Sequence, residues 1–410
     1  MKLSARRAGI HLGITLTAAL LVFGACSTGK KSDSHITATD QVPSSDEPWP
    51  VRMQALSATL SELLPLVVSR SKFNNAENFE KIEKETRKLR SLAHSLKMGD
   101  TPNEDPSMRI MGGLFEEDIE RALDALNAGS REYARQILKN TTSYCIQCHT
   151  QTGTGPEFPR LDFSLNTDDL TYHEQAEFFA ATRQFDRALE AYSKFLDDPN
   201  LAKYDPFEWE QTARAALSIF VRVKNDPDAA GKWINRIRSH AALPDSIKSE
   251  IQHWRKSVQE WRRERKPDLL DSPEKALARA EELIKIAQKR QEYPMDHTQD
   301  VYYFRASRIL HEFLERYGPR HELGAKALYL SGIAAEATRD MNFWTLHETY
   351  YEYCIRMKPH SDLAQKCFER LNDSITLGYS GSGGVRIPPE VRKRLETFRE
   401  LAAPIKTDKK

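Results

Sequence analysis

Apolar residues recur every three or four positions through most of the chain, which is the period of an amphipathic helix. Before residue 150 this pattern predicts helices of the kind that pack into a four-helix bundle. Their predicted ranges are about Val51 to Arg70 with a bend at Pro65, Ala76 to Met98, Asp105 to Leu126, and Ser130 to Cys148. Gly129 is the expected stop before the fourth helix. Because no segment alternates apolar and polar residues as a strand does, we predict an all-α fold.

From about Leu170 the pattern changes to pairs of helices with alanine and aromatic residues at fixed steps. The clearest unit contains Tyr172, Ala176, Phe179, Phe185, Ala188, Tyr192 and Pro199. This unit resembles the tetratricopeptide repeat, whose small residues let two helices pack closely. The later units are degenerate, so we expect a helical solenoid over residues 170–403. The resemblance implies a concave surface that holds a protein or peptide partner, although the same residues would also serve packing alone.

Three shorter segments complete the second half of the chain. The basic stretch Trp254 to Lys266 is interpreted as a solvated helix face in preference to a binding patch. A flexible loop is expected over Gly378 to Gly384, and the pair Pro388-Pro389 starts a last helix that would cap the solenoid. Residues 404–410 are expected to form a disordered tail.

The N-terminus has the features of an export signal. Basic residues precede an apolar run from Ala8 to Ala25, which predicts a signal peptide over residues 1–25. Phe23-Gly24-Ala25-Cys26 resembles a bacterial lipobox, with Phe in place of the usual Leu, and the resemblance implies lipidation of Cys26. A plain signal peptide or an uncleaved anchor would also export the chain.

Residues 26–50 are rich in Ser, Thr, Asp, Lys and Pro, which predicts a disordered tether. We therefore expect the protein in the bacterial cell envelope, anchored by lipid on the periplasmic side of a membrane. Ser27, in the second position after the lipidated cysteine, favours the outer membrane over the inner membrane by analogy with lipoprotein sorting.

The run Cys145-Ile146-Gln147-Cys148-His149 carries the clearest chemistry in the sequence. The two thiols are three residues apart and the imidazole is four after the first, so all three share one face of a helix. This spacing is that of a c-type haem attachment site. Cys145 and Cys148 would bind one covalent haem c, and His149 would be the proximal iron ligand. A redox dithiol would need a thioredoxin-like setting of strands, and a zinc site would need further ligands nearby.

Four helices with this motif near the end of the last resemble the cytochrome c prime family over about residues 51–155. The resemblance implies that His149 binds the iron and that a first-helix side chain covers the opposite face. Aligning Pro65 with the family pattern places Leu56 there, which would leave a five-coordinate haem open to a small neutral gas. Met53, on the same face, would instead give a six-coordinate electron carrier, and this alternative stays open.

Other candidate ligands are interpreted as structural. Met98, Met108 and Met111 are expected to fill the core, since methionine at helical spacing does so more often than it binds metal. His94 lies among many charged residues and is expected at the surface.

Two cysteines remain, Cys354 and Cys367, at similar distances from a turn at Lys358 to Ser361. Antiparallel helices would bring them opposite each other. Both a disulfide, which would persist in an oxidising compartment, and a pair of buried free thiols are consistent with this spacing.

These observations together predict an electron-transfer protein: a membrane-tethered periplasmic monohaem cytochrome, with a linker over residues 156–169 and repeats that dock a redox partner protein. Two alternatives are binding of nitric oxide or another small gas, and a protein-assembly scaffold with structural haem. The chain has 60 Lys and Arg against 59 Asp and Glu, which gives no reason to expect nucleic acid as a partner. No phosphate-binding loop, metal-binding His pair or activated nucleophile is visible in the sequence, so we do not expect an enzyme.

Overall fold

The computed structural model describes residues 42–98, 106–151, 153, 170–264, 272–293, 296–341 and 345–405. The predictions for the signal peptide, for Cys26, for the linker over residues 156–169 and for residues 406–410 lie outside the described residues, as does most of the tether. The described part is almost wholly helical, which confirms the all-α prediction.

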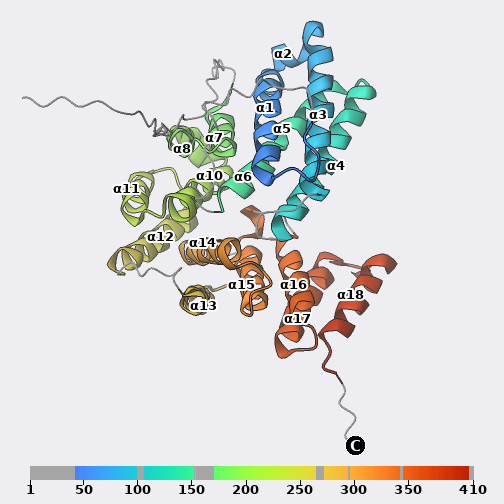
Figure 1. The fold of residues 1–410 in the computed structure, drawn as a ribbon. Helices are drawn as coiled ribbons and strands as arrows, with labels where there is room; N and C mark the ends of the chain where they lie inside the picture. Colours follow the sequence, from blue (N-terminus) through green and yellow to red (C-terminus); the bar gives the residue numbers. More distant parts are fainter. Residues whose placement is uncertain are drawn as a thin grey trace, which may run out of the picture. The chain divides into compact units, whose positions relative to one another are not determined.

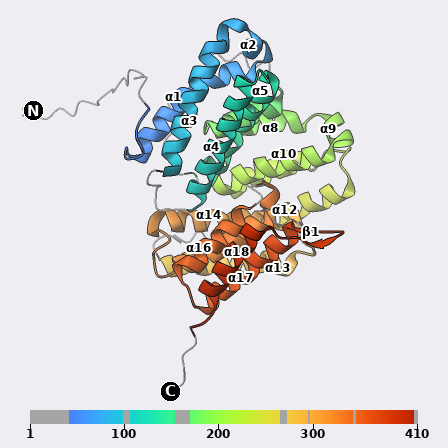
Figure 2. The same ribbon diagram turned by 90° about the vertical axis from the view of Figure 1, so that its right-hand side faces the viewer.

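The first helices of the chain pack side by side (Figures 1 and 2). They are α1 (Trp49–Val68), α3 (Phe79–Met98), α4 (Pro106–Asn127) and α5 (Arg131–Asn140). Helix α1 contacts α3 and α5, and α4 also contacts α3 and α5, so the four helices close a ring around shared apolar side chains. Leu63, Leu92, Ile119 and Leu138 are buried there. Each helix therefore buries the apolar stripe that its sequence pattern predicts.

Local chemistry sets the ends of these helices. Helix α1 contains Pro65 and ends at Val68, and extended Ser69 then starts the short α2 (Arg70–Asn74) and the 3₁₀ turn η1 (Ala76–Asn78). Gly129 has φ of 75° and ends α4, as expected of a residue without a Cβ. The structure divides the predicted fourth helix at Thr141 into α5 and α6 (Thr142–His149). The Thr141 hydroxyl donates to the Leu138 carbonyl at 2.6 Å, a side-chain bond that competes with the helical backbone pattern.

Among the described helices, α1 alone is long and apolar enough to cross a membrane by length and composition. Core helices of proteins that do not cross membranes pass the same test. Here Leu60, Leu63, Leu64 and Val67 of α1 are buried inside the protein, which is the behaviour of a core helix.

The second half of the chain consists of helices that pack mainly against their neighbours in sequence (Figures 1 and 2). They are α7 (Tyr172–Ala181), α8 (Phe185–Leu196), α9 (Pro199–Tyr204), α10 (Pro206–Ser218), the π-helical η4 (Ile219–Lys224), α11 (Pro227–Ile237), α12 (Asp245–Arg263), α13 (Pro273–Arg290), η6 (His297–Gln299), α14 (Asp300–Tyr317), α15 (Gly324–Ala337), η7 (Arg339–Met341), α16 (Leu346–Met357), α17 (Asp362–Gly378) and α18 (Pro389–Ala402). The pairs α7 with α8, α11 with α12 and α13 with α14 are in contact, and α14 to α18 continue the series.

The predicted glycine-rich loop over Gly378 to Gly384 contains a small antiparallel hairpin of β1 (Ser380–Gly381) and β2 (Gly384–Val385). The expectation of a plain loop without strands is therefore wrong at this point. Strands of two residues are too short to show an alternating pattern, so the sequence gives no signal for them.

Buried apolar side chains form two clusters. The first extends from Leu56 of α1 to Phe304 of α14, and the second from Ala276 of α13 to Ala402 of α18. The first helices of the chain thus share one core with α7 to α12.

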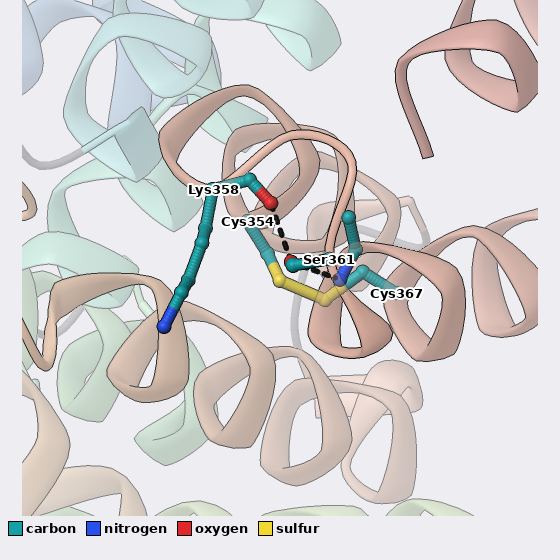
Figure 3. Close-up of a disulfide and its surroundings, with 5 residues drawn as sticks. Cys354, Lys358, Ser361 and Cys367 are labelled. Atoms are coloured by element: carbon teal, nitrogen blue, oxygen red, sulfur yellow. Dashed lines mark hydrogen bonds between the residues drawn. A yellow bond between two sulfur atoms is a disulfide. The ribbon is translucent and has the colours of Figure 1, made fainter. Parts of the chain in front are cut away.

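Helices α16 and α17 are joined by a disulfide between Cys354 and Cys367, with Cα atoms 6.4 Å apart (Figure 3). Both cysteines are fully buried. The turn between the helices is held by Ser361, whose hydroxyl donates to the Lys358 carbonyl at 2.6 Å and accepts from the Ala364 amide at 3.1 Å. Of the two states left open by the sequence, the structure contains the bonded one.

Candidate cofactor site

The Cys-x-x-Cys-His motif occupies the second half of α6, which contacts α4, α5 and α7. Cys145 and Cys148 are one turn apart on this helix, and neither takes part in a disulfide. The motif therefore lies where the ring of helices meets the first helix of the second half of the chain.

Cys145 packs against the first buried cluster. Burial raises the pKa of the Cys145 thiol to about 12, so the thiol is protonated at neutral pH. A redox dithiol needs a thiolate as its nucleophile, and such thiolates lie in electropositive, partly exposed surroundings. Cys145 is partly exposed, but its raised pKa disfavours that chemistry.

Cys148 faces two methionines of α4. Its Sγ atom lies 3.4 Å from Met111 Sδ and 3.9 Å from Met108 Sδ. Met111 is only 2% exposed. These two residues were interpreted from the sequence as core filler, and the only sequence signal of this contact is their three-residue spacing near the start of a helix.

His149 is oriented by the last turn of α7. Its Nδ1 atom lies 2.6 Å from the Ala181 carbonyl oxygen. Because a carbonyl only accepts, Nδ1 carries the hydrogen and Nε2 carries the lone pair. Burial lowers the pKa of His149 to about 4, so the ring is neutral at pH 7. A neutral imidazole whose other nitrogen donates to a backbone carbonyl is the form that binds a metal.

Arg183 closes the C-terminal end of α6. Its guanidinium donates to the carbonyls of His149 at 3.4 Å and Gly153 at 3.3 Å. A cation at this end of a helix interacts favourably with the helix dipole. Arg183 itself has φ of 60°, an uncommon conformation for a residue with a side chain. Ala181 and Arg183 together hold both the ring and the backbone of His149.

The exit from the motif also depends on a glycine. A Cβ atom at Gly153 would lie 2.6 Å from the carbonyl oxygen of Val223, in the π-helical segment η4. Only glycine allows the two backbones to approach this closely.

Two further side chains of α6 fix its position. Tyr144 donates to Asp118 of α4 at 2.7 Å, and its ring lies 5.7 Å from that of Phe115. Gln147 donates to the Met341 carbonyl of η7 at 3.5 Å. Side chains of α6 thus contact segments from both halves of the chain.

The predicted distal residues lie on α1. Leu56 is 4% exposed and belongs to the first buried cluster, and Met53 packs against that cluster from its edge, as does Cys145. Leu56, Met53 and Cys145 thus belong to or adjoin one cluster, which extends as far as Phe304, and this alone does not place either α1 residue against the motif. The His94 side chain is 60% exposed and pairs with Glu116 at 2.6 Å, at the surface where it was expected.

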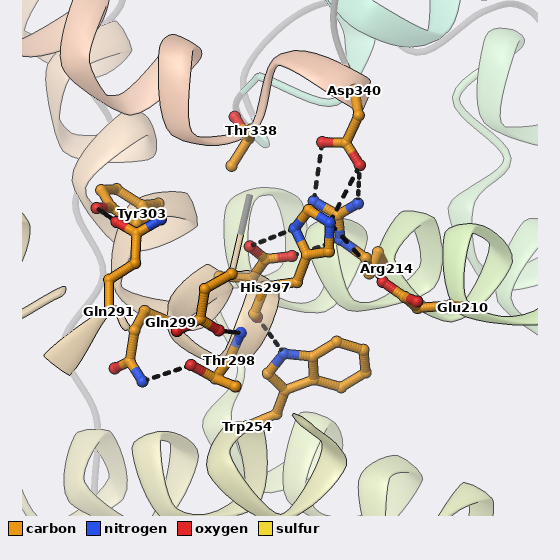
Figure 4. Close-up of polar contacts among 12 residues, drawn as sticks. Glu210, Arg214, Trp254, Gln291, His297, Thr298, Gln299, Tyr303, Thr338 and Asp340 are labelled. Carbon is orange, nitrogen blue, oxygen red and sulfur yellow. Dashed lines mark hydrogen bonds and ion pairs between the residues drawn. The ribbon is translucent and has the colours of Figure 1, made fainter. Parts of the chain in front are cut away.

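A separate polar cluster, the Arg214 network, connects α10, α14 and η7 (Figure 4). The Arg214 side chain is fully buried, and its Nε atom donates to Asp300 at 2.6 Å. Its other nitrogens bind both oxygens of Asp340. Burial lowers the pKa of Arg214, but attraction to these two carboxylates outweighs that effect and raises it. His297 Nε2 lies 3.5 Å from Asp340, and Glu210 also faces the cluster.

Within the ranges that the structure describes, no group of three or more His, Cys, Asp or Glu side chains is arranged to hold a metal ion by itself. Comparisons with models of protein families, with curated proteins and with solved structures found no match to this chain.

Proposed function

We propose that the chain is a membrane-tethered periplasmic monohaem c-type cytochrome that transfers electrons. One observation carries the proposal: two thiols outside any disulfide and a neutral imidazole follow each other on α6, and the imidazole is oriented by the Ala181 carbonyl. These are the donors that covalent haem attachment requires, in the order it requires them.

In this proposal Cys145 and Cys148 would hold a haem through thioether bonds, and His149 would bind its iron through Nε2. The bound haem would supply a reversible one-electron iron couple. The contact with Ala181 keeps the imidazole in the metal-binding tautomer and prevents it from rotating. Arg183 holds the end of α6, so the ring and its backbone move together. Cys145 is partly buried and packs against the apolar cluster, so one side of the motif adjoins apolar side chains.

The finer architecture belongs to the same proposal. The closed ring of α1, α3, α4 and α5 supports a cytochrome c prime-like bundle, and the successive helix pairs from α7 to α18 support a tetratricopeptide-like array. The array would dock the redox partner protein, and a lipid on Cys26 would hold the whole chain at the membrane.

A second candidate function is binding of a small neutral gas such as nitric oxide. It is favoured by the burial of Leu56, the predicted distal residue, which is an apolar side chain that cannot bind iron. A haem covered by leucine alone would have an open coordination position.

The test is covalent haem attachment in a bacterium with c-type haem maturation. We expect haem-dependent staining that survives a denaturing gel, with reduced or lost staining in Cys145→Ser and Cys148→Ser. The matched control is the double variant Cys354→Ser/Cys367→Ser, which removes the two cysteines of the disulfide, far along the chain from the motif, and should keep the stain. Unstained wild-type protein, or equal staining in all variants, would contradict the proposal.

A further inference from the structure

Two methionine sulfur atoms lie beside Cys148. Neither belongs to Leu56 or Met53 of α1, the residues predicted to cover the distal face of the haem. Met108 and Met111 are one turn apart on α4, so their side chains leave the same face of the helix. Both Sδ atoms lie within 4 Å of Cys148 Sγ, at 3.9 Å and 3.4 Å. The face of α4 that meets the motif is therefore a thioether face.

Packing alone is a common reason for a buried methionine. Here, however, two methionines converge on one atom, and in the proposed function that atom is bonded to the edge of the porphyrin. Thioether sulfur is a soft donor that binds haem iron opposite a histidine. Met111 is 2% exposed, so a sulfur–iron bond at this position would be shielded from water.

The proximal and distal sides would come from different helices. The His149 ring is held by the end of α7 through Ala181, whereas the thiol of Cys148 packs against α4. Each of α4 and α7 makes its own contact with α6. Donors for the two axial positions of one iron must come from different sides of it. Here the histidine belongs to α6 and is held by α7, and the methionines belong to α4.

We propose that Met111 of α4, and not Met53 or Leu56 of α1, is the sixth ligand of the haem iron, with Met108 packing beside it. The inference rests on the proposed haem attachment and makes it more specific. A His149–Met111 pair gives a six-coordinate iron that does not bind carbon monoxide, which favours electron transfer over gas binding.

The experiment uses the full-length exported protein and three single variants, Met111→Leu, Met108→Leu and Met53→Leu. Leucine conserves side-chain volume, so each variant should fold, and circular dichroism checks this directly. Haem content is measured first, by denaturing-gel stain and by the pyridine haemochrome. Visible spectra of the oxidised, reduced and carbon monoxide-treated forms follow.

We expect wild type, Met108→Leu and Met53→Leu to be low-spin, to show the methionine-to-iron charge-transfer band, and to ignore carbon monoxide. Met111→Leu should keep its covalent haem, lose that band, become high-spin and bind carbon monoxide. Met111→His should restore a low-spin spectrum without the band.

Two results would overturn the inference while leaving the cytochrome assignment intact. One is loss of the band in Met53→Leu or Met108→Leu with Met111→Leu unaffected. The other is a wild-type haem that is already high-spin and binds carbon monoxide. Wild-type protein without covalent haem would overturn the proposed function together with this inference.

Discussion

Arg214 offers the sharpest test of how the second half of the chain is held together. Its guanidinium is the cation that faces both Asp300 and Asp340, and the side chains of Arg214 and Asp300 are completely buried. Substitution by methionine keeps a long, flexible side chain but removes the charge. The variant Arg214→Met therefore leaves two carboxylates facing each other without that cation.

The expected cost follows from the burial. Removing one partner of a buried ion pair typically costs about 3–5 kcal/mol, since the remaining charge has lost both water and its partner. Burial raises the pKa of Asp300, so protonation of this carboxyl offsets part of the loss. We expect a decrease of about 3 kcal/mol in the free energy of unfolding at pH 7. The decrease should be smaller at lower pH, where the carboxyls take up protons.

The matched control is Arg87→Met on α3. Arg87 pairs with Glu83 at 2.6 Å, but the two side chains are 56% and 48% exposed. Exposed pairs of this kind contribute about 0–1 kcal/mol. Urea unfolding, followed by circular dichroism, measures both effects. The dependence of the free energy of unfolding on urea concentration should be the same for all three proteins. If Arg214→Met and Arg87→Met lowered the free energy of unfolding by the same amount, burial of the Arg214 network would not be the cause of its larger contribution to stability.

Three further predictions concern stability. Replacing Cys354 and Cys367 by serine should lower the free energy of unfolding by about 3 kcal/mol, the entropy cost of a loop of this length, and reductant should abolish the difference between the proteins in urea titrations. Burial, and after it the charges of nearby carboxylates, raises the pKa of Glu250 from 4.5 to about 8. The protonated carboxyl therefore contributes to stability fully below pH 4.5, and this contribution is lost as the pH rises from 4.5 through 8. Glu250→Gln should remove that part of the pH dependence. The urea midpoint of each protein is measured at pH 5 and at pH 8.5, and an equal change in midpoint between the two pH values for wild type and variant would contradict the prediction. A Cβ at Gly332 would overlap the buried Tyr351 ring, so Gly332→Ala should cost about 1–3 kcal/mol, seen as a lower thermal midpoint; an unchanged midpoint would show that the ring moves freely.

Much of the helical structure could be predicted because it depends on local signals. The apolar period predicts α1, α3 and α4, and it predicts one helix where the structure has α5 and α6. Gly129, the expected stop, ends α4 with a positive φ. The spacing in the motif likewise fixes Cys145 and Cys148 on one face of α6, since both lie within one turn of the same helix.

The remaining features depend on contacts between distant parts of the chain. Met111 reaches Cys148 across 37 positions, and Arg214 reaches Asp340 across 126, and no local pattern contains either distance. The break at Thr141 was missed for another reason. A threonine fits a helix by its period, and only its side-chain bond to Leu138 shows where the backbone departs from it.

The acceptor that orients His149 is a main-chain oxygen, and this has a consequence for how the site can vary. A side-chain acceptor would be lost by one codon change, whereas every residue at position 181 carries the same carbonyl. Ala181 is 4% exposed, so a larger side chain there would act by displacing the end of α7 and not by removing the bond. The size of the side chain therefore limits which residues position 181 can hold. The hydrogen bond itself depends only on the course of the backbone at the end of α7.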